Sequence, residues 1–321
     1  MAEKANPKEF TAHFRKLDRE SVSQAGGKGA QLSEIFNAGI PVPEGFVVLT
    51  DSFDAFLGHH TLEDKIFDLI DACNPKKPAT IKKASKSIQA MIMKGKMPLH
   101  IEQFVFKDFD KLKAEYVAVR SSATAEDASN ASWAGELDTY TNITRKDLIE
   151  NVKKCWASLF TERAIFYRIE KNMKHEHVSV AVVVQKMVQS EVSGVAFTVH
   201  PITQDRNKMV IEAGLGLGES VVAGKITPDN YIIDKKEGII DEVTIGKQLT
   251  MISRKQGKSL EYTVPLKDQE KQKLHGKHIL ELAKICMHIE KHYGHPQDIE
   301  WALEKNKLYI VQTRPITTLS K

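Results

Sequence analysis

The sequence has little cysteine, with three such residues in 321. Cys73, Cys155 and Cys286 lie far apart and form no C-x-x-C pair, which argues against a disulfide framework. We expect each of them to be a small buried apolar residue rather than a catalytic thiol. This cysteine usage is typical of a reducing compartment and predicts a cytoplasmic location.

The sequence also has no long apolar segment and no large excess of positive or negative charge. No stretch is long enough to span a bilayer, and the first ten residues, MAEKANPKEF, are too polar for a signal peptide. The 46 Lys and Arg residues nearly balance the 42 Asp and Glu residues, so the net charge of +4 does not indicate a nucleic-acid-binding protein. We therefore expect a globular protein that binds neither membranes nor nucleic acid, with enough residues for two subdomains.

The most informative stretch, residues 117–142, reads VAVRSSATAEDASNASWAGELDTYTN. The apolar run 117–119 predicts a strand, Ser132–Gly135 predicts a mobile turn, and 139–142 predicts a second strand. Arg120 at the end of the first strand offers a planar fork of donors for phosphate oxygens, and the glycine lets the backbone approach them. This pattern favours a nucleoside triphosphate site. The alternative is a strand, a solvated loop and a strand, with Arg120 in a surface ion pair.

A second basic position lies in the segment GGKGA, residues 26–30. The apolar residues Leu32, Ile35 and Phe36 that follow predict a helix that ends at Gly39, which places Lys28 near its N-terminus. Backbone N–H groups, the helix dipole and a lysine together favour an anion. The spacing is not that of a Walker A loop. A glycine-rich turn with a solvated lysine is the alternative.

The rest of the chain alternates helical and strand patterns and predicts an α+β protein. The apolar run 178–188 predicts a central strand, and the glycines after Glu212 predict either a phosphate cradle or a tight turn against another backbone. We expect helices over 51–113 with breaks near Gly58, Asn74 and Pro98, helices over 147–168 and 268–292, and strands over 46–49, 192–199, 209–211 and 231–245.

Near the C-terminus, 298–303 and 308–312 alternate as strands do, and residues 304–307 form a polar turn between them. If Ala302 pairs with Ile310, Glu300 falls opposite Gln312, with Asp298 and Arg314 next along that face. A carboxylate, an amide oxygen and an arginine there favour Mg²⁺ and the phosphate it carries. A slip by one residue would separate the two ligands. The alternative is a hairpin with one solvated polar face.

Together these segments resemble the N-terminal nucleotide-binding domain of the phosphoenolpyruvate synthase and pyruvate phosphate dikinase family, which rifampin phosphotransferase shares. The motif sequences are most similar to those of the synthase branch. The matching segments run in the family's order and are GGKGAQLSEIFNAGIPVPEGFVV, VAVRSSATAEDASNASWAGELDTY, ASLFTERAIFYR, VVVQKMVQSEVSGVAFTVHP, EAGLGLGESVVAGKITPDNY, DIEWALE and VQTRP.

The resemblance implies an ATP-grasp-type fold in which two α+β subdomains, 17–180 and 181–321, close over ATP. Lys28, Arg120 and Arg314 would be the catalytic cations on the phosphates, and the turn from Ser132 to Gly135 would close over them. Glu136 to Asp138 differ from the glutamine-containing form common in the family, which puts the contacts of that turn in doubt. The other implied ligands are Gln185, Lys186, Met187 and Val188 at the adenine, Glu212 at the ribose, and Glu300 and Gln312 on Mg²⁺.

In this family the domain passes the β-phosphate of ATP to a histidine on a swivelling domain and AMP is released, after which a third domain makes phosphoenolpyruvate. None of the 12 histidines here lies in a T-S-H-A type motif, so we expect the phosphohistidine and phosphoenolpyruvate/pyruvate domains to be absent. The chain is then a fragment, or a subunit whose acceptor sits on another chain.

The expected function is the ATP- and Mg²⁺-dependent phosphoryl-donor half of a pyruvate, water dikinase type of enzyme, in gluconeogenesis. The alternatives are a non-catalytic nucleotide-binding regulatory subunit and the ATP domain of a rifampin-type antibiotic phosphotransferase.

Overall fold

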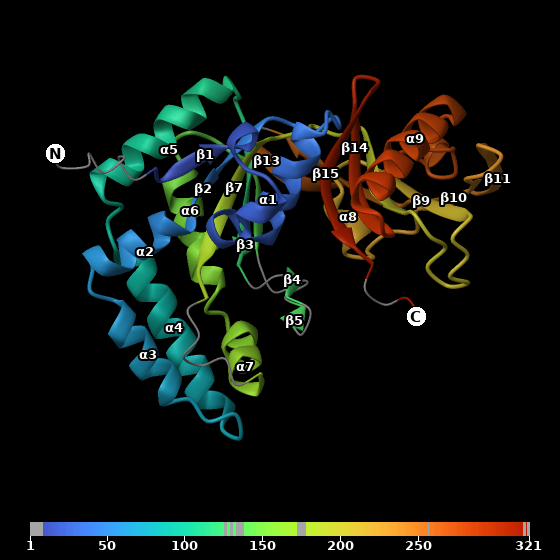
Figure 1. Cartoon of the computed structure of the whole chain (residues 1–321). Helices are drawn as coiled ribbons and strands as arrows, with labels where there is room; N and C mark the ends of the chain where they lie inside the picture. The colour runs from blue at the N-terminus through green and yellow to red at the C-terminus, as the bar shows by residue number, and fades with distance from the viewer. Residues whose placement is uncertain are drawn as a thin grey trace. The chain divides into compact units, whose positions relative to one another are not determined.

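A computed structural model of the chain describes residues 9–124, 127–128, 131–132, 138–171, 178–255, 257–316 and 319. The chain divides into two compact units, and each is described here by itself (Figure 1). The first unit consists of Met1–Glu34 and Glu44–Met187, and the second of Ile35–Pro43 and Val188–Lys321.

The first unit is built on an antiparallel five-stranded sheet in the order β1-β2-β7-β3-β6. The central strand β7 falls in the apolar run predicted for it, and its residues 180–184 are buried. Burial on both faces explains why this strand is a continuous run of small and β-branched residues. The strands are β1 (Thr11–His13), β2 (Gly45–Val48), β7 (Val180–Lys186), β3 (Val117–Ala123) and β6 (Thr139–Ile143).

One face of this sheet carries the hydrophobic core of the unit. Phe46, Val119 and Val184 point to this face and pack with buried residues from the surrounding helices. The breaks between the helices fall where proline, glycine and asparagine predicted them. These helices are α2 (Thr50–His59), α3 (Glu63–Asp71), α4 (Pro78–Lys94), α5 (Leu99–Leu112), α6 (Leu148–Ser158) and α7 (Glu162–Glu170).

The opposite face of the sheet lies against α1 (Val22–Asn37). A Cβ atom on Gly29 of this helix would lie 3.2 Å from a methyl group of Val47 and 3.6 Å from one of Val183. Val47 and Val183 pair across β2 and β7, so both point to the α1 face. The residues before Leu17 include strand β1 and two buried side chains, Ala12 and Phe14, so this part of the chain belongs to the packed unit.

The second unit is an antiparallel six-stranded sheet in the order β11-β10-β9-β8-β14-β15. Helix α9 (Gly276–Tyr293) packs against β9, β11 and β14 and buries the apolar residues Ile279, Leu282 and Ile289. The strands are β8 (Val192–Phe197), β9 (Lys208–Leu215), β10 (Asp229–Asp234), β11 (Ile239–Thr244), β14 (Gln297–Glu304) and β15 (Lys307–Pro315). Short additions are α8 (Glu219–Val222) and the hairpin of β12 (Thr250–Lys255) and β13 (Lys258–Thr263), which the sequence pattern did not predict.

The first two glycines after Glu212 lie at the end of a strand and in a tight turn. Strand β9 continues through Glu212 to Leu215, and its Gly214 packs against the side chains of Val221 and Ile226. Gly216 has a φ of +89° and lies against the backbone of Ile252. Close backbone approach and a positive φ both require glycine, so Gly216 makes the tight turn against another backbone that was one of the two predictions.

A buried ion pair fastens the segment before α9 to β10. Lys273 Nζ lies 2.8 Å from Asp229 Oδ1, and the two side chains are 1% and 0% exposed. Tyr231 donates its hydroxyl to Asp229 Oδ2 at 2.7 Å, and the N–H groups of Gly246 and Lys273 donate to the same carboxylate. The Lys273 ammonium also donates to the Gly246 carbonyl. Because each charge has several partners, the pair is stable in a dry environment.

This network explains why α9 begins later than predicted. The helical pattern was expected from Asp268, but α9 starts at Gly276. The backbone N–H of Leu274 donates to the Tyr231 hydroxyl and that of Lys273 to Asp229, so this segment follows the network rather than a helix.

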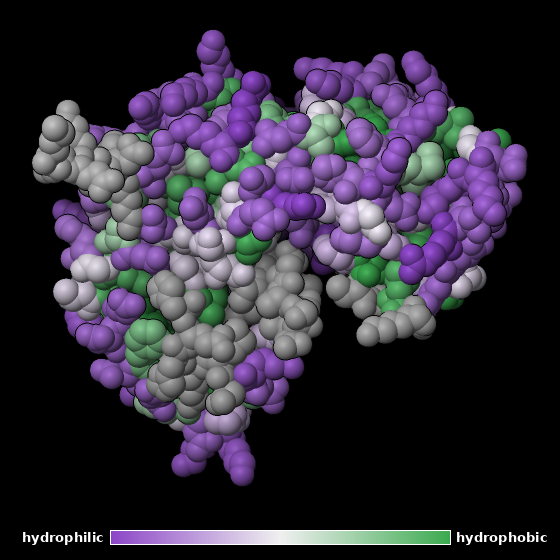
Figure 2. Space-filling model, in the orientation of Figure 1, coloured by the Kyte–Doolittle hydropathy of each residue, from purple (hydrophilic) through white to green (hydrophobic). Residues whose placement is uncertain are grey.

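The α+β class predicted from the sequence is confirmed, since helices and antiparallel sheets build both units. The face seen in Figure 2 is mainly hydrophilic, with smaller hydrophobic areas between. Among the described residues, none of the helices combines the length and apolar character that a membrane span needs.

Candidate functional site

Lys28 lies where α1 is interrupted. Gly26 has a φ of 66° and a ψ of 171°, so the regular helix restarts just before Lys28, as the glycine-rich pattern predicted. Lys28 Nζ donates a hydrogen bond of 2.8 Å to the main-chain oxygen of Ser121. Ser121 follows Arg120 in β3, so the structure brings two predicted phosphate-binding cations to one part of the first unit.

Arg120 is buried, not solvated. It lies in β3 between Val183 of β7 and Thr139 of β6, and it is 7% exposed. The alternation along β3 places Arg120 on the same face as Ser122, which contacts α1. Burying a guanidinium has a large desolvation cost, which a surface ion pair would avoid. The alternative of a surface ion pair is therefore wrong.

The predicted closing turn falls mostly outside the described residues. Gly135 is one of those not described. For Ser132 the structure gives the backbone alone, which pairs with Asp127 in the short ladder of β4 (Asp127–Ala128) and β5 (Ala131–Ser132). The roles of Ser132 and Gly135 stay predictions.

The predicted adenine strand ends the first unit. Gln185 is 2% exposed in β7, and Lys186 Nζ lies 2.6 Å from Glu44 Oε2, which holds the pKa of the Glu44 carboxyl below its usual value. The N–H of Lys186 donates to the Glu44 carbonyl and that of Met187 to the Tyr116 carbonyl. These bonds fix the end of β7 and occupy both N–H groups. The next residue, Val188, begins the second unit.

In the second unit, Glu300 lies opposite Gln312, but not for the reason expected. Residues 305 and 306 have φ values of 50° and 61°, which is the geometry of a two-residue type I′ turn, and this turn pairs Glu304 with Lys307. Ala302 consequently faces Tyr309, so the expected pairing with Ile310 was wrong.

A β-bulge then restores the predicted pairing. The register shifts between Glu300 and Trp301, where Val311 is the additional residue of β15. Beyond it, Glu300 faces Gln312 and Asp298 faces Arg314. The turn type and the bulge both had to be known, and the sequence pattern indicated neither.

Glu212 shares a row with Glu300 and Gln312. It pairs with Val195 of β8, which pairs with Glu300 of β14, so Glu212, Glu300 and Gln312 point to the same face of the sheet. Burial, and then the negative charge of Asp298, raise the pKa of the Glu212 carboxyl. The alternating pattern of the strand predicted over 209–211, if continued through Glu212, would have placed Glu212 on this face.

Asp298 and Arg314 form an ion pair on that face. Arg314 Nη2 lies 2.7 Å and Nε 2.8 Å from Asp298 Oδ2. Burial raises the pKa of the Asp298 carboxyl, while Arg314 opposes that rise. The face therefore offers a carboxylate and an amide oxygen side by side, with an arginine held next to them.

The family model of the pyruvate phosphate dikinase AMP/ATP-binding domain matches residues 22–321. The chain belongs to this family. It is 46% identical over 311 residues to a probable phosphoenolpyruvate synthase of Archaeoglobus fulgidus, covering 95% of this chain and 41% of that protein. It is 44% identical over 326 residues to one of Methanocaldococcus jannaschii (99% and 27%) and 40% identical over 313 residues to a rifampicin phosphotransferase of Bacillus cereus (97% and 36%).

The chain thus spans less than half the length of these three members of the family. The family resemblance seen in the sequence is confirmed, and with it ATP binding as the activity of the domain.

For an AMP/ATP-binding domain of this family, Glu300 and Gln312 suit Mg²⁺. Within the described parts of the chain, no group of three or more His, Cys, Asp or Glu side chains is arranged to hold a metal ion. Mg²⁺ commonly binds to one or two carboxylates and takes its other ligands from water and substrate phosphates. The donor set fits an ion that arrives with a nucleotide better than one held by protein alone.

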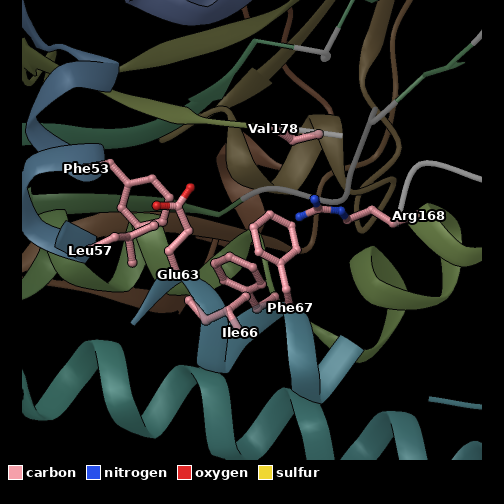
Figure 3. Close-up of a pocket in the computed structure, with 8 residues that line it drawn as sticks. Phe53, Leu57, Glu63, Ile66, Phe67, Arg168 and Val178 are labelled. Carbon is pink, nitrogen blue, oxygen red and sulfur yellow. The ribbon is translucent and has the colours of Figure 1, made fainter. Parts of the chain in front are cut away.

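The first unit also has a small cavity (Figure 3). Its volume is about 30 Å³, enough for one or two water molecules but not for a nucleotide. It contains none of the predicted site residues. Its lining residues are Phe53, Leu57, Glu63, Ile66, Phe67, Phe160, Arg168 and Val178.

Proposed function

We propose that this chain is the ATP- and Mg²⁺-dependent phosphoryl-donor part of a phosphoenolpyruvate synthase-like system of the pyruvate, water dikinase type. It transfers phosphate from ATP to a histidine on a separate domain or chain, and AMP is released. Membership of an AMP/ATP-binding family and the synthase relatives support this proposal. The observation that carries it is the bond between Lys28 Nζ and Ser121, beside Arg120 in β3.

In this proposal Lys28 and Arg120 bind the phosphates of ATP, and Arg314 is a third cation on them. Phosphoryl transfer requires little covalent chemistry from the protein, because positioned positive charge stabilises the negative charge of the transition state. A buried guanidinium is suited to this role, since a charge in a dry site interacts more strongly than one in water.

Glu300 and Gln312 hold Mg²⁺ in the proposed complex. The ion supplies charge neutralisation at the phosphate oxygens. The ion pair of Asp298 and Arg314 fixes the arginine next to the metal ligands and limits its rotamers before ATP binds.

The remaining predicted residues bind the nucleoside or close over it. Gln185, Lys186, Met187 and Val188 contact the adenine. The N–H groups of Lys186 and Met187 already donate to Glu44 and Tyr116, so other backbone groups of this segment read the base. Glu212 contacts the ribose. The turn from Ser132 to Gly135 closes over the phosphates, and the two units are the subdomains of an ATP-grasp-type fold.

Calorimetry of the chain with ATP, with and without Mg²⁺, tests the donor role. We expect binding that Mg²⁺ strengthens, and AMP with acid-labile phosphohistidine once the histidine domain of a phosphoenolpyruvate synthase is added. ATP binding without AMP release, with every histidine domain tried, would instead support a nucleotide-binding regulatory subunit. No ATP binding at all would overturn the proposal.

A second candidate is the ATP domain of an antibiotic phosphotransferase. It is favoured by the 40% identity to the rifampicin phosphotransferase of Bacillus cereus. Phosphate transfer to rifampicin with the remaining domains of that protein, and none to pyruvate with those of a synthase, would decide for this candidate.

A further inference from the structure

A side chain from strand β3, that of Ser122, is inserted into the backbone hydrogen-bond ladder of α1. In an uninterrupted α-helix the N–H of Gly29 would donate to the carbonyl of Ala25, four residues earlier. Here the hydroxyl of Ser122, from β3, lies between these two groups. It accepts from the Gly29 N–H at 3.0 Å and donates to the Ala25 oxygen at 2.8 Å. A side chain inserted into the ladder is a recognised cause of a helix kink.

The kink lies directly against the inserted serine. Gly26, with its φ of 66°, is placed so that a Cβ atom would overlap the carbonyl oxygen and the hydroxyl of Ser122. A glycine is therefore required both by the positive φ and by the lack of space. Ser122 itself is 0% exposed, so its hydroxyl has no competing contact with solvent.

These contacts fix Lys28 at both ends of its side chain. Its backbone lies between Gly26 and Gly29, which both contact Ser122, and its ammonium donates to Ser121 at 2.8 Å. A lysine side chain that samples many rotamers loses conformational entropy when it is fixed. A lysine already fixed to β3 loses less of it on binding a phosphate.

We propose that Ser122 is a positioning residue for Lys28. Its hydroxyl holds the α1 kink open, and the kink places the Lys28 ammonium beside β3, where it meets the phosphates of the nucleotide. Ser122 acts through Lys28 and does not touch ATP. This inference rests on the proposed phosphate-binding role of Lys28.

A double-mutant cycle on the full chain tests this inference, with the affinities for ATP and for adenosine measured by calorimetry. Ser122→Ala should weaken ATP binding about five- to tenfold, as expected for one or two buried hydrogen bonds, and leave adenosine binding unchanged. In a Lys28→Met background the same change should cost nothing further, because its target is gone. Ser122→Cys keeps the size but forms weak hydrogen bonds, so it should lose ATP affinity in the same direction.

The matched control is Ser33→Ala. It removes a buried hydroxyl of the same helix, one that donates to the Gly29 carbonyl at 2.8 Å. It should lower the melting temperature without a selective loss of ATP affinity. If Ser122→Ala loses the same ATP affinity with and without Lys28, the positioning role of Ser122 is overturned, while the phosphate role of Lys28 stands. A matching loss of adenosine affinity would have the same meaning. Unchanged ATP affinity in Lys28→Met would overturn the phosphate role of Lys28 as well. If Ser122→Ala does not fold, the cycle is run with Ser122→Cys.

Discussion

Glu300 lies directly opposite Gln312, even though the residues nearer the turn are paired one step out of that register. The side chains of an opposed pair have Cβ atoms about 4.5–5.5 Å apart, so a carboxylate and an amide oxygen here can reach one cation together. The bulge at Val311 makes this possible, because the turn alone would place a different residue opposite Glu300.

The first prediction concerns this pair. Glu300→Gln keeps the shape of the side chain but removes its charge, so nucleotide binding should depend less on Mg²⁺. The measurement is ATP affinity across a Mg²⁺ titration. The control is Glu281→Gln, which removes one carboxylate from the exposed side of α9 and should leave the Mg²⁺ titration unchanged. If the Glu300 variant gives the same titration as the unaltered chain, Glu300 is not a metal ligand.

The second prediction concerns the cations of the first unit. Lys28→Ala and Arg120→Ala should each weaken ATP binding by roughly 1.5–3 kcal/mol, the usual contribution of a charge-assisted hydrogen bond. Lys82→Ala removes an exposed lysine of α4 and should change nothing. Because Arg120 is buried, its variant needs a melting curve to separate lost contacts from lost folding. Unaltered affinity in both variants would contradict the phosphate site.

The third prediction concerns the buried pair of Asp229 and Lys273. Asp229→Asn or Lys273→Met leaves one charge without its partner in a dry environment, which costs roughly 3–5 kcal/mol of unfolding free energy. The double variant should lose less than the sum of the two single losses, because it buries no lone charge. Urea unfolding of the three variants measures this coupling. Strictly additive losses would mean that the two side chains do not depend on each other.

The fourth prediction concerns acid stability. The N–H of Glu237 and then the ammonium of Lys208 hold the pKa of Asp234 at about 2, below its ordinary value of 3.8. A depressed pKa in the folded state gives a stabilising contribution that is complete above about pH 4 and is lost as the pH falls towards 2.

The Asp234→Asn variant should therefore be less stable than the unaltered chain at neutral pH, and the difference should shrink between pH 4 and 2. Melting temperatures across this range test the prediction, with Glu281→Gln again as the control for a lost carboxylate. A difference that stays constant down to pH 2 would show that Asp234 titrates normally.

The sequence predicts those parts of the fold that depend on local patterns. The strand around Val182, the helix breaks and the helix restart before Lys28 all follow from periodicity and from glycine and proline. Features that depend on distant contacts were not predicted. The Ser122 hydroxyl inside α1, the late start of α9 and the bulge at Val311 each need a partner far away in the chain, which no local pattern specifies.

The same distinction applies to the candidate site. The predicted phosphate and metal roles of Lys28, Arg120 and Glu300 depend on residue type and local pattern, which the sequence provides. That Arg120 is buried, and that Glu212 shares a row with Glu300, depends on how strands pair, and pairing is fixed by the whole sheet.

The bulge at Val311 separates the tip of the last hairpin from its base. Near the tip, the pairing register is the one set by the tight turn. At the base, the register is shifted by one residue, which aligns Glu300 with Gln312. A change in the number of residues between this turn and Gln312 would thus move Gln312 out of line with Glu300.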